Sequence, residues 1–261
     1  MLSTRLATRV VIGLAAGLAL LAPAARAHFL ELIPSADVLP EGGEVRLDLR
    51  FTHPFDGGPV MEMAAPARFG MWRGGAAVDL IGRLQPAPVD GATTWSASVD
   101  LSEPGPALFY VEPQPYWEPA EGKFIVHFTK VLVDSFATGE GWDDLIGLPV
   151  EIRPLTRPTG LWVGNVFQGV VLKDGAPVPD AEVEVEFIND GTVTAPNDAF
   201  VTQVIRADAM GTFTYAMPRA GWWGFAALLE GDAPMTSPEG TAVPVEEGAL
   251  IWVRAQDMTA D

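Results

Sequence analysis

Apolar and polar residues alternate over short segments of this chain, which predicts a protein built from β-strands. Residues 44–53, EVRLDLRFTH, place an apolar side chain on every second position, as in a strand with one buried face. Residues 123–133 are apolar on both faces and predict a central strand. Residues 95–113 read as a strand, a Pro-Gly-Pro turn and a second strand, and residues 116–118 look like a loop. Glycine and proline punctuate the chain throughout, and no long helical period appears, so the fold class expected is all-β.

The strand pattern is interrupted once, near Arg153, where Pro154 and Pro158 precede a second β series. Tight turns are expected at 173–175 and 210–211, because each contains a glycine between apolar runs. We therefore predict two immunoglobulin-like β-sandwich domains, at residues 28–153 and 158–261. The order GVVLKDGAPVPDAEV, ADAMGTF and aromatic residues after a glycine resembles the carboxypeptidase-regulatory or transthyretin-like module. That resemblance covers roughly residues 160–255 and implies a fold, not an activity.

The first 27 residues have the pattern of a secretory signal peptide. Arg5 and Arg9 precede the apolar run VVIGLAAGLALLAPA, and Ala25-Arg26-Ala27 places small residues at the two positions that a signal peptidase reads. The run is short for a membrane span, which needs about 20 apolar residues. We expect cleavage after Ala27, a periplasmic location, and no membrane insertion of the mature chain, which then begins at His28.

Composition narrows the chemistry. The formal net charge is −18, and removing a leader that carries arginines but no acidic residue makes it more negative. Such a surface repels nucleic acid, so no nucleic-acid partner is expected. The chain has no cysteine, which excludes disulfides and thiolate metal sites. Any metal ion must be held by imidazole, carboxylate, thioether or backbone nitrogen.

All three histidines, His28, His53 and His127, lie in the first predicted domain. A terminal His28 offers an α-amine and an imidazole from one residue, which form a chelate without closing a loop. His53 ends the inward face of a strand, at the rim where sandwiches build sites. His127 lies mid-strand among apolar residues and needs a partner if it is buried. Each histidine alone has an ordinary structural explanation; together they favour a shared metal site.

Met61 and Met63 follow His53 closely and share one face if that segment is extended. Their thioethers are possible additional ligands for a soft metal ion. An equally good interpretation is that both fill the core.

At these residues the sequence resembles the periplasmic proteins described as soluble components of nickel/cobalt transport systems, a group often known only as a domain of unknown function. The elements that carry the resemblance are AHFLELIPS, LRFTHPFDGGPVMEM, PYWEPAEGKFIVHFTKVLVD and the sandwich-like C-terminal region. It extends over essentially the whole mature chain. It implies delivery of nickel or cobalt to inner-membrane transporter subunits, with His28, His53 and His127 as ligands.

The function expected is therefore a periplasmic metal-binding protein that carries nickel or cobalt, with copper as the alternative ion, and not an enzyme. Imidazole and amine nitrogens suit these ions better than magnesium or calcium. Release to a partner suggests an exposed site, and protons should displace the ion between about pH 7 and 5. Two other classes stay open. One is a copper monooxygenase-like enzyme with an amino-terminal histidine, and the other is a metal-free carbohydrate-binding or adhesion module that uses some of the eight tryptophans.

Overall fold

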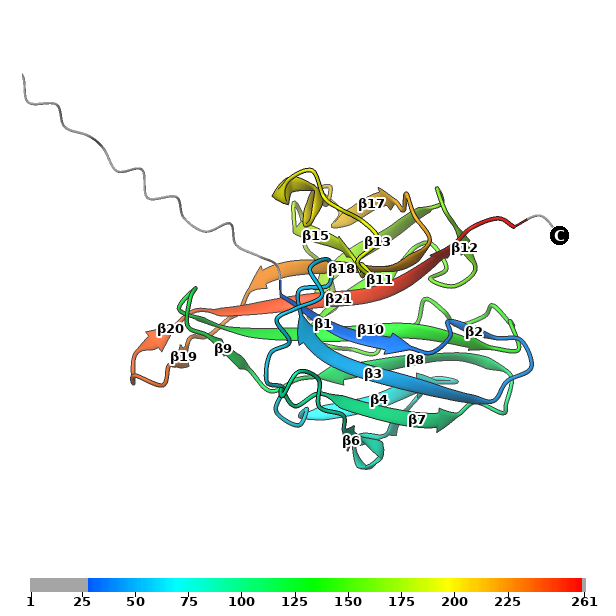
Figure 1. Ribbon diagram of the computed structural model, residues 1–261, viewed down its shortest axis with the longest axis horizontal. Helices are drawn as coiled ribbons and strands as arrows, with labels where there is room; N and C mark the ends of the chain where they lie inside the picture. The colour runs from blue at the N-terminus through cyan, green and yellow to red at the C-terminus, as the bar shows by residue number, and fades with distance from the viewer. Residues whose placement is uncertain (1–27, 260–261) are drawn as a thin grey trace, which may run out of the picture.

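The computed structural model describes residues 28–259, which form an all-β structure, as expected (Figure 1). One outer sheet has the order β1-β3-β7-β6, and a second outer sheet joins β11, β13, β14 and β17. Between them lies an eleven-stranded central sheet with the main order β16-β15-β18-β21-β10-β8-β4-β5. The first outer sheet consists of β1 (Phe29–Pro34), β3 (Glu44–Thr52), β6 (Gln85–Pro86) and β7 (Trp95–Asp100).

The remaining elements belong to the other sheets or to connections. The central sheet contains β2 (Val38–Leu39), β4 (Arg68–Arg73), β5 (Ala76–Asp79), β8 (Gly105–Glu112), β9 (Tyr116–Glu118), β10 (Lys123–Ser135), β12 (Leu161–Trp162), β15 (Glu182–Phe187), β16 (Gln203–Arg206), β18 (Gly221–Glu230) and β21 (Val245–Gln256). The second outer sheet contains β11 (Val150–Pro154), β13 (Val166–Lys173), β14 (Ala176–Pro177) and β17 (Thr212–Ala216). A small ribbon pairs β19 (Met235–Thr236) with β20 (Ala242–Val243), and two 3-10 turns are η1 (Ile81–Arg83) and η2 (Asp198–Phe200).

The central sheet is shared by both halves of the chain. Strand β10 pairs in parallel with β21, from Phe124 opposite Val245 to Val131 opposite Trp252. The first outer sheet packs on one face of this sheet and the second outer sheet on the other, as the two lobes of Figure 1 show. The chain thus forms two sandwiches whose inner layers are continuous, because two long strands hydrogen-bond across the junction.

Residue parity along β10 and β21 decides which core each side chain enters. Successive side chains of a strand point to opposite faces. On β10, Ile125 and Val131 belong to the first core, whereas Phe128 belongs to the second. On β21, Trp252 enters the first core and donates its indole N–H to the carbonyl of Leu30 at 2.9 Å. Apolar residues on both faces of 123–133, which predicted a central strand, therefore serve two different cores.

Other sequence predictions can be compared directly with the strands. The expected strand at 44–53 is confirmed as β3, with its four apolar side chains buried. The turn at 173–175 joins β13 to β14, with positive φ at Asp174 and Gly175, where glycine lacks the Cβ that opposes this conformation. Residues 116–118, expected to be a loop, form the short strand β9 against β10. Strand β11 contains Arg153 and Pro154, so it runs through the expected boundary, and it pairs with β13 of the second sandwich.

A buried ion pair joins the central sheet to the second outer sheet. Lys130 of β10 faces the second sandwich, and its Nζ donates to Glu151 Oε1 of β11 at 2.6 Å. The other oxygen of Glu151 accepts from the backbone N–H groups of Gly147 and Leu148. Burial lowers the pKa of Lys130, while Glu151 opposes that shift. Every charged group in this contact has a partner, as a buried pair requires.

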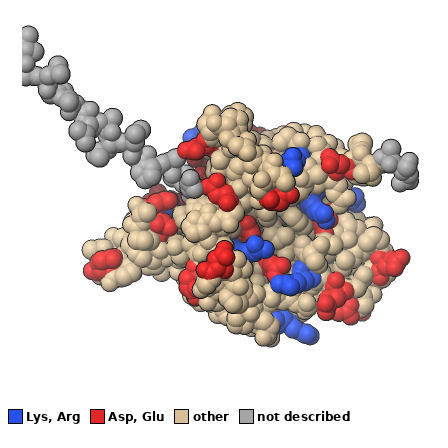
Figure 2. All heavy atoms as spheres, viewed as in Figure 1, with Lys and Arg blue, Asp and Glu red and all other residues tan. Residues whose placement is uncertain are grey.

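Within residues 28–259 no helix has the length and apolar character needed to cross a bilayer. The expected leader, residues 1–27, lies outside the described residues. On the face shown in Figure 2, Asp and Glu are spread over both lobes and the projecting β19–β20 ribbon, and Lys and Arg are scattered among them over the lobes.

Candidate functional site

Strand pairing places two of the three histidines side by side. Strands β1 and β3 are antiparallel, with Phe29 opposite Thr52, and the next positions outward are His28 and His53. Residues opposite each other in a sheet project to the same face. The two imidazole rings accordingly lie with their centroids 4.5 Å apart.

The third histidine approaches from the central sheet. His127 shares the face of β10 that carries Ile125, so its ring projects into the first sandwich. The aromatic ring of Phe51 lies beside the rings of His28 and His127. Its centroid is 5.5 Å from the ring centroid of His28 and 5.7 Å from that of His127. The structure therefore brings His28, His53 and His127 to one end of the first sandwich.

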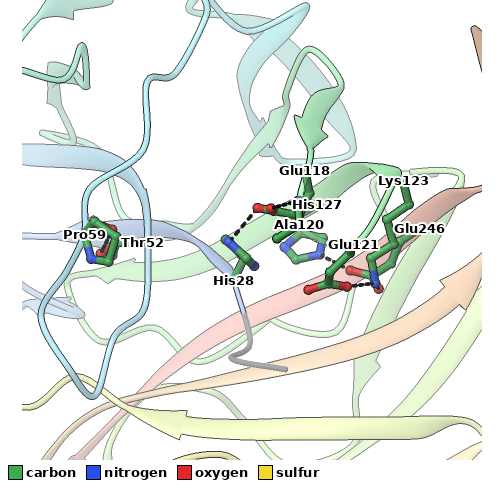
Figure 3. A network of polar contacts seen from close by, with 9 residues as sticks. All are labelled: His28, Thr52, Pro59, Glu118, Ala120, Glu121, Lys123, His127 and Glu246. Carbon is green, nitrogen blue, oxygen red and sulfur yellow. Dashed lines mark hydrogen bonds and ion pairs between the residues drawn. The ribbon is translucent and has the colours of Figure 1, made fainter. Parts of the chain in front are cut away.

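Two carboxylates engage the outer nitrogens of these rings (Figure 3). Glu118 Oε2 of β9 lies 3.1 Å from His28 Nε2. Glu246 Oε1 of β21 lies 3.2 Å from His127 Nε2. In each case the contact occupies Nε2, which leaves Nδ1 as the ring nitrogen available to another partner.

The Nδ1 atom of His127 is buried and has no hydrogen-bond partner among the described residues. The side chain is only 2% exposed, so solvent does not satisfy this nitrogen. A buried polar atom without a partner costs about 1–3 kcal/mol. Such an atom points to a ligand that the protein chain itself does not supply.

The electrostatics keep His28 in the form that binds metals. Burial and the neighbouring His53 lower the pKa of His28, and Glu118 opposes them only in part. The imidazole is therefore neutral at neutral pH, with a lone pair available.

The site differs from the sequence expectation in its exposure. His28 is 12% exposed and His53 is 7% exposed, so the rings are buried rather than displayed on an open rim. Among residues 28–259 no three His, Asp or Glu side chains already surround one point at metal-binding distances. Assignment of His28, His53 and His127 as ligands remains a prediction.

Met61 and Met63 pack in the core of the first sandwich. The backbone N–H of Met61 donates to the carbonyl of Phe51 at 2.8 Å, and the carbonyl of Met63 accepts from the Trp95 indole at 3.0 Å. This burial agrees with the gap-filling interpretation, while thioether ligation remains a prediction.

A small pocket of about 120 Å³ adjoins His127. Phe51, Met63, Tyr116, Trp117 and His127 are among its lining residues. A larger open hollow of about 820 Å³ lies near the far end of β10, beside Trp72 and Gly105. The smaller pocket is thus the one next to the candidate site.

Sequence reasoning missed the residues that contact the histidine rings from outside. Glu118 was treated as part of a loop, and Glu246 lies over a hundred residues from His127 along the chain. The alternation of side chains along a strand assigns Glu246 to one face of β21. Nothing in one sequence indicates that β21 pairs in parallel with β10.

Comparisons with known proteins identify the family. The model of the family described as Domain of unknown function (DUF4198) matches residues 25–231, most of the chain, so the protein belongs to that family. No curated protein matches.

The solved structures that resemble the chain include immunoglobulin-like proteins. The adhesin InvE of Yersinia pseudotuberculosis is 13% identical, with a TM-score of 0.24, and the match covers 84% of this chain and 58% of that one. Titin Ig tandem domains A164-A165 are 12% identical, with a TM-score of 0.22, and the match covers 89% of this chain and 98% of the titin chain. The α-2-macroglobulin of Escherichia coli is 12% identical, with a TM-score of 0.26, and the match covers 89% of this chain and 16% of the macroglobulin chain. The chain thus spans little more than half of InvE and a small part of the macroglobulin.

Proposed function

We propose that this member of the DUF4198 family is exported and binds a nickel or cobalt ion between His28, His53 and His127, and that it delivers the ion to transporter subunits in the inner membrane. The observation that carries the proposal is the buried Nδ1 of His127, which has no partner among the described residues. A metal ion supplies such a partner, since neutral imidazole is the commonest protein metal ligand.

The contacts of His28 support the same set of nitrogens. Glu118 engages Nε2 of His28, so Nδ1 is the nitrogen left for a metal. If cleavage after Ala27 frees the α-amine, that amine and Nδ1 of the same residue close a six-membered chelate ring around one ion. The chelate requires no movement of another chain segment, which reduces the entropy lost on binding.

The spacing of His28 and His53 also suits ligation. An imidazole nitrogen lies about 2 Å from a bound ion, which puts two rings that meet the ion at a right angle about 4.5 Å apart, centroid to centroid. The observed separation is 4.5 Å. For His28 and His53 to bind one ion, the orientation of the two rings has to change, whereas the strands that carry them can stay in place.

Donor chemistry selects a class of ion. Three imidazoles and an amine suit nickel(II), copper(II) or cobalt(II), and the intrinsic affinity of copper is the highest of these. Nickel or cobalt is preferred here because of the resemblance of the chain to proteins of nickel and cobalt transport. Delivery to an importer follows from the same resemblance, and metal supply rather than affinity then decides which ion is carried.

The test uses the secreted form, with its terminus confirmed by mass spectrometry, titrated with nickel, cobalt and copper. The matched control retains a methionine before His28, which removes the free amine from that residue. Binding of one ion per chain, weaker in the control and weaker as the pH falls from about 7 to 5, is the expected result. Absence of binding by the correctly cleaved protein overturns the proposal.

A copper enzyme is a second candidate because of the pocket beside His127, whose aromatic lining includes Phe51, Tyr116 and Trp117. A pocket next to a metal offers room for a small substrate. Ascorbate-driven peroxide formation by the copper-loaded protein, abolished in His28→Ala, would favour that function over delivery.

A further inference from the structure

Strand β21 of the central sheet borders the histidine site. In the parallel register of β10 and β21, His127 lies opposite Gly248, and Ile125 lies opposite Glu246. Side chains at positions 246 and 248 share the face to which His127 projects. Residues 246 and 248 therefore both lie next to the imidazole ring of His127.

Gly248 leaves the space that the imidazole ring occupies. A methyl group at this position would overlap Cδ2 of His127 and come within 2.9 Å of its Nε2. The backbone of Gly248 does not have the positive φ that requires glycine elsewhere. The ring of His127 and the neighbouring Leu250, not the backbone, thus exclude a side chain here.

Glu246 contacts the ring from the same strand and is itself held in place. One carboxylate oxygen lies 3.2 Å from Nε2 of His127, and the other accepts from Lys123 Nζ at 2.5 Å. Lys123 also contacts Glu121 Oε2 at 2.6 Å, as Figure 3 shows. With one oxygen fixed by Lys123, the other oxygen of the carboxylate is placed to accept the Nε2 proton of His127.

We propose that Glu246 and Gly248 are positioning residues for the metal site, which hold His127 as the Nε2-protonated tautomer with Nδ1 turned toward the ion. This inference rests on the proposed function. It makes the C-terminal half of the chain part of the site, because β21 comes from that half, pairs with β10 and orients one of the ligands. Carboxylates that accept the second N–H of a ligating histidine commonly contribute tenfold to a hundredfold to metal affinity.

The first test compares Glu246→Gln with Glu247→Gln, which alters the next residue, in contact with Lys173 instead of the histidine. Nickel affinity is measured by calorimetry, and the tautomer of His127 by two-bond ¹H–¹⁵N spectra of the metal-free protein. For E246Q we expect affinity about 10–100-fold below wild type and loss of the pure Nε2–H tautomer. E247Q should match wild type in both measurements, and E246D should recover part of the affinity.

The outcomes separate this inference from the proposed function. If wild type binds nickel and E246Q binds as tightly with an unchanged tautomer, the positioning role is wrong. If wild type binds no metal, the proposed function fails, and the tautomer spectra still show whether Glu246 orients the ring.

Gly248→Ala provides a second test through sterics rather than charge. The methyl group should displace the His127 ring and lower nickel affinity by more than E246Q does. Gly82→Ala is the control, because no heavy atom lies within 4 Å of the added methyl group there and its φ is not in the left-handed range. Thermal unfolding identifies any loss of folding, and a folded G248A protein with wild-type affinity would contradict the proposed packing.

Discussion

Two buried polar residues on β10, three positions apart, have opposite surroundings. Lys130 faces the second sandwich and meets Glu151 at 2.6 Å, and backbone N–H groups satisfy the rest of that carboxylate. His127 faces the first sandwich, contacts Glu246 through Nε2, and keeps Nδ1 without a partner among the described residues. One contact is complete within the chain and joins two sheets. The contact of His127 is incomplete, and this is the observation behind the proposal that His127 binds a ligand.

The largest effect on stability is expected at the ion pair between Lys130 and Glu151, in which every charged group has a partner. Glu151→Gln leaves the buried Lys130 without a countercharge, which should lower the free energy of unfolding by about 3–5 kcal/mol. Chemical denaturation measures the loss. Glu182→Gln is the control, since Glu182 pairs with Arg206 at the surface and is expected to contribute less than about 1 kcal/mol. If E151Q and E182Q are equally stable, the pair does not hold the sheets together.

The buried carboxylate of Glu31 sharpens the comparison, because its cation lies farther away than Lys130 lies from Glu151. Glu31 on β1 is 5% exposed, and its nearest cation, on Arg50, is 4.0 Å away. Burial, only partly opposed by Arg50, raises its pKa to about 7. A carboxyl whose pKa is raised by folding destabilises the folded state as pH rises from its unfolded pKa to about 7, and the loss is then complete.

Glu31→Gln should therefore stabilise the protein at about pH 8 by up to about 3 kcal/mol, and the gain should disappear towards the unfolded pKa of a glutamate, about 4.3. Unfolding of both proteins at the two pH values measures the difference, with the exposed Glu44→Gln as control. A gain that does not change with pH would contradict ionisation of Glu31 as the cause.

The smallest effect on stability is expected at the contact between His127 and Glu246, where Nδ1 of His127 has no partner among the described residues. His127→Phe removes the unpartnered nitrogen, which offsets the loss of the contact with Glu246, so the free energy of unfolding should change by no more than about 1 kcal/mol. The same variant should lose nickel binding, measured by calorimetry. A large loss of stability in H127F would show that His127 is a structural residue, like Lys130.

Much of the local structure followed from the sequence. Alternation in 44–53 predicted the strand and its buried face, and the glycine-containing turn at 173–175 predicted a hairpin, because both depend on neighbouring residues alone. Tyr116–Glu118 was expected to be a loop, since three residues are too few to show a period. Tertiary pairing with β10 made it a strand and placed Glu118 beside His28.

The sequence by itself determined the all-β class, the absence of thiol chemistry and the confinement of all three histidines to the first half of the chain. These properties follow from composition and from a period of two residues. Only the tertiary structure decided that β10 and β21 form one continuous sheet, that His127 projects towards His28 and His53, and that Glu246 contacts its ring. Pairing between strands more than a hundred residues apart depends on packing of the whole chain, which no local pattern encodes.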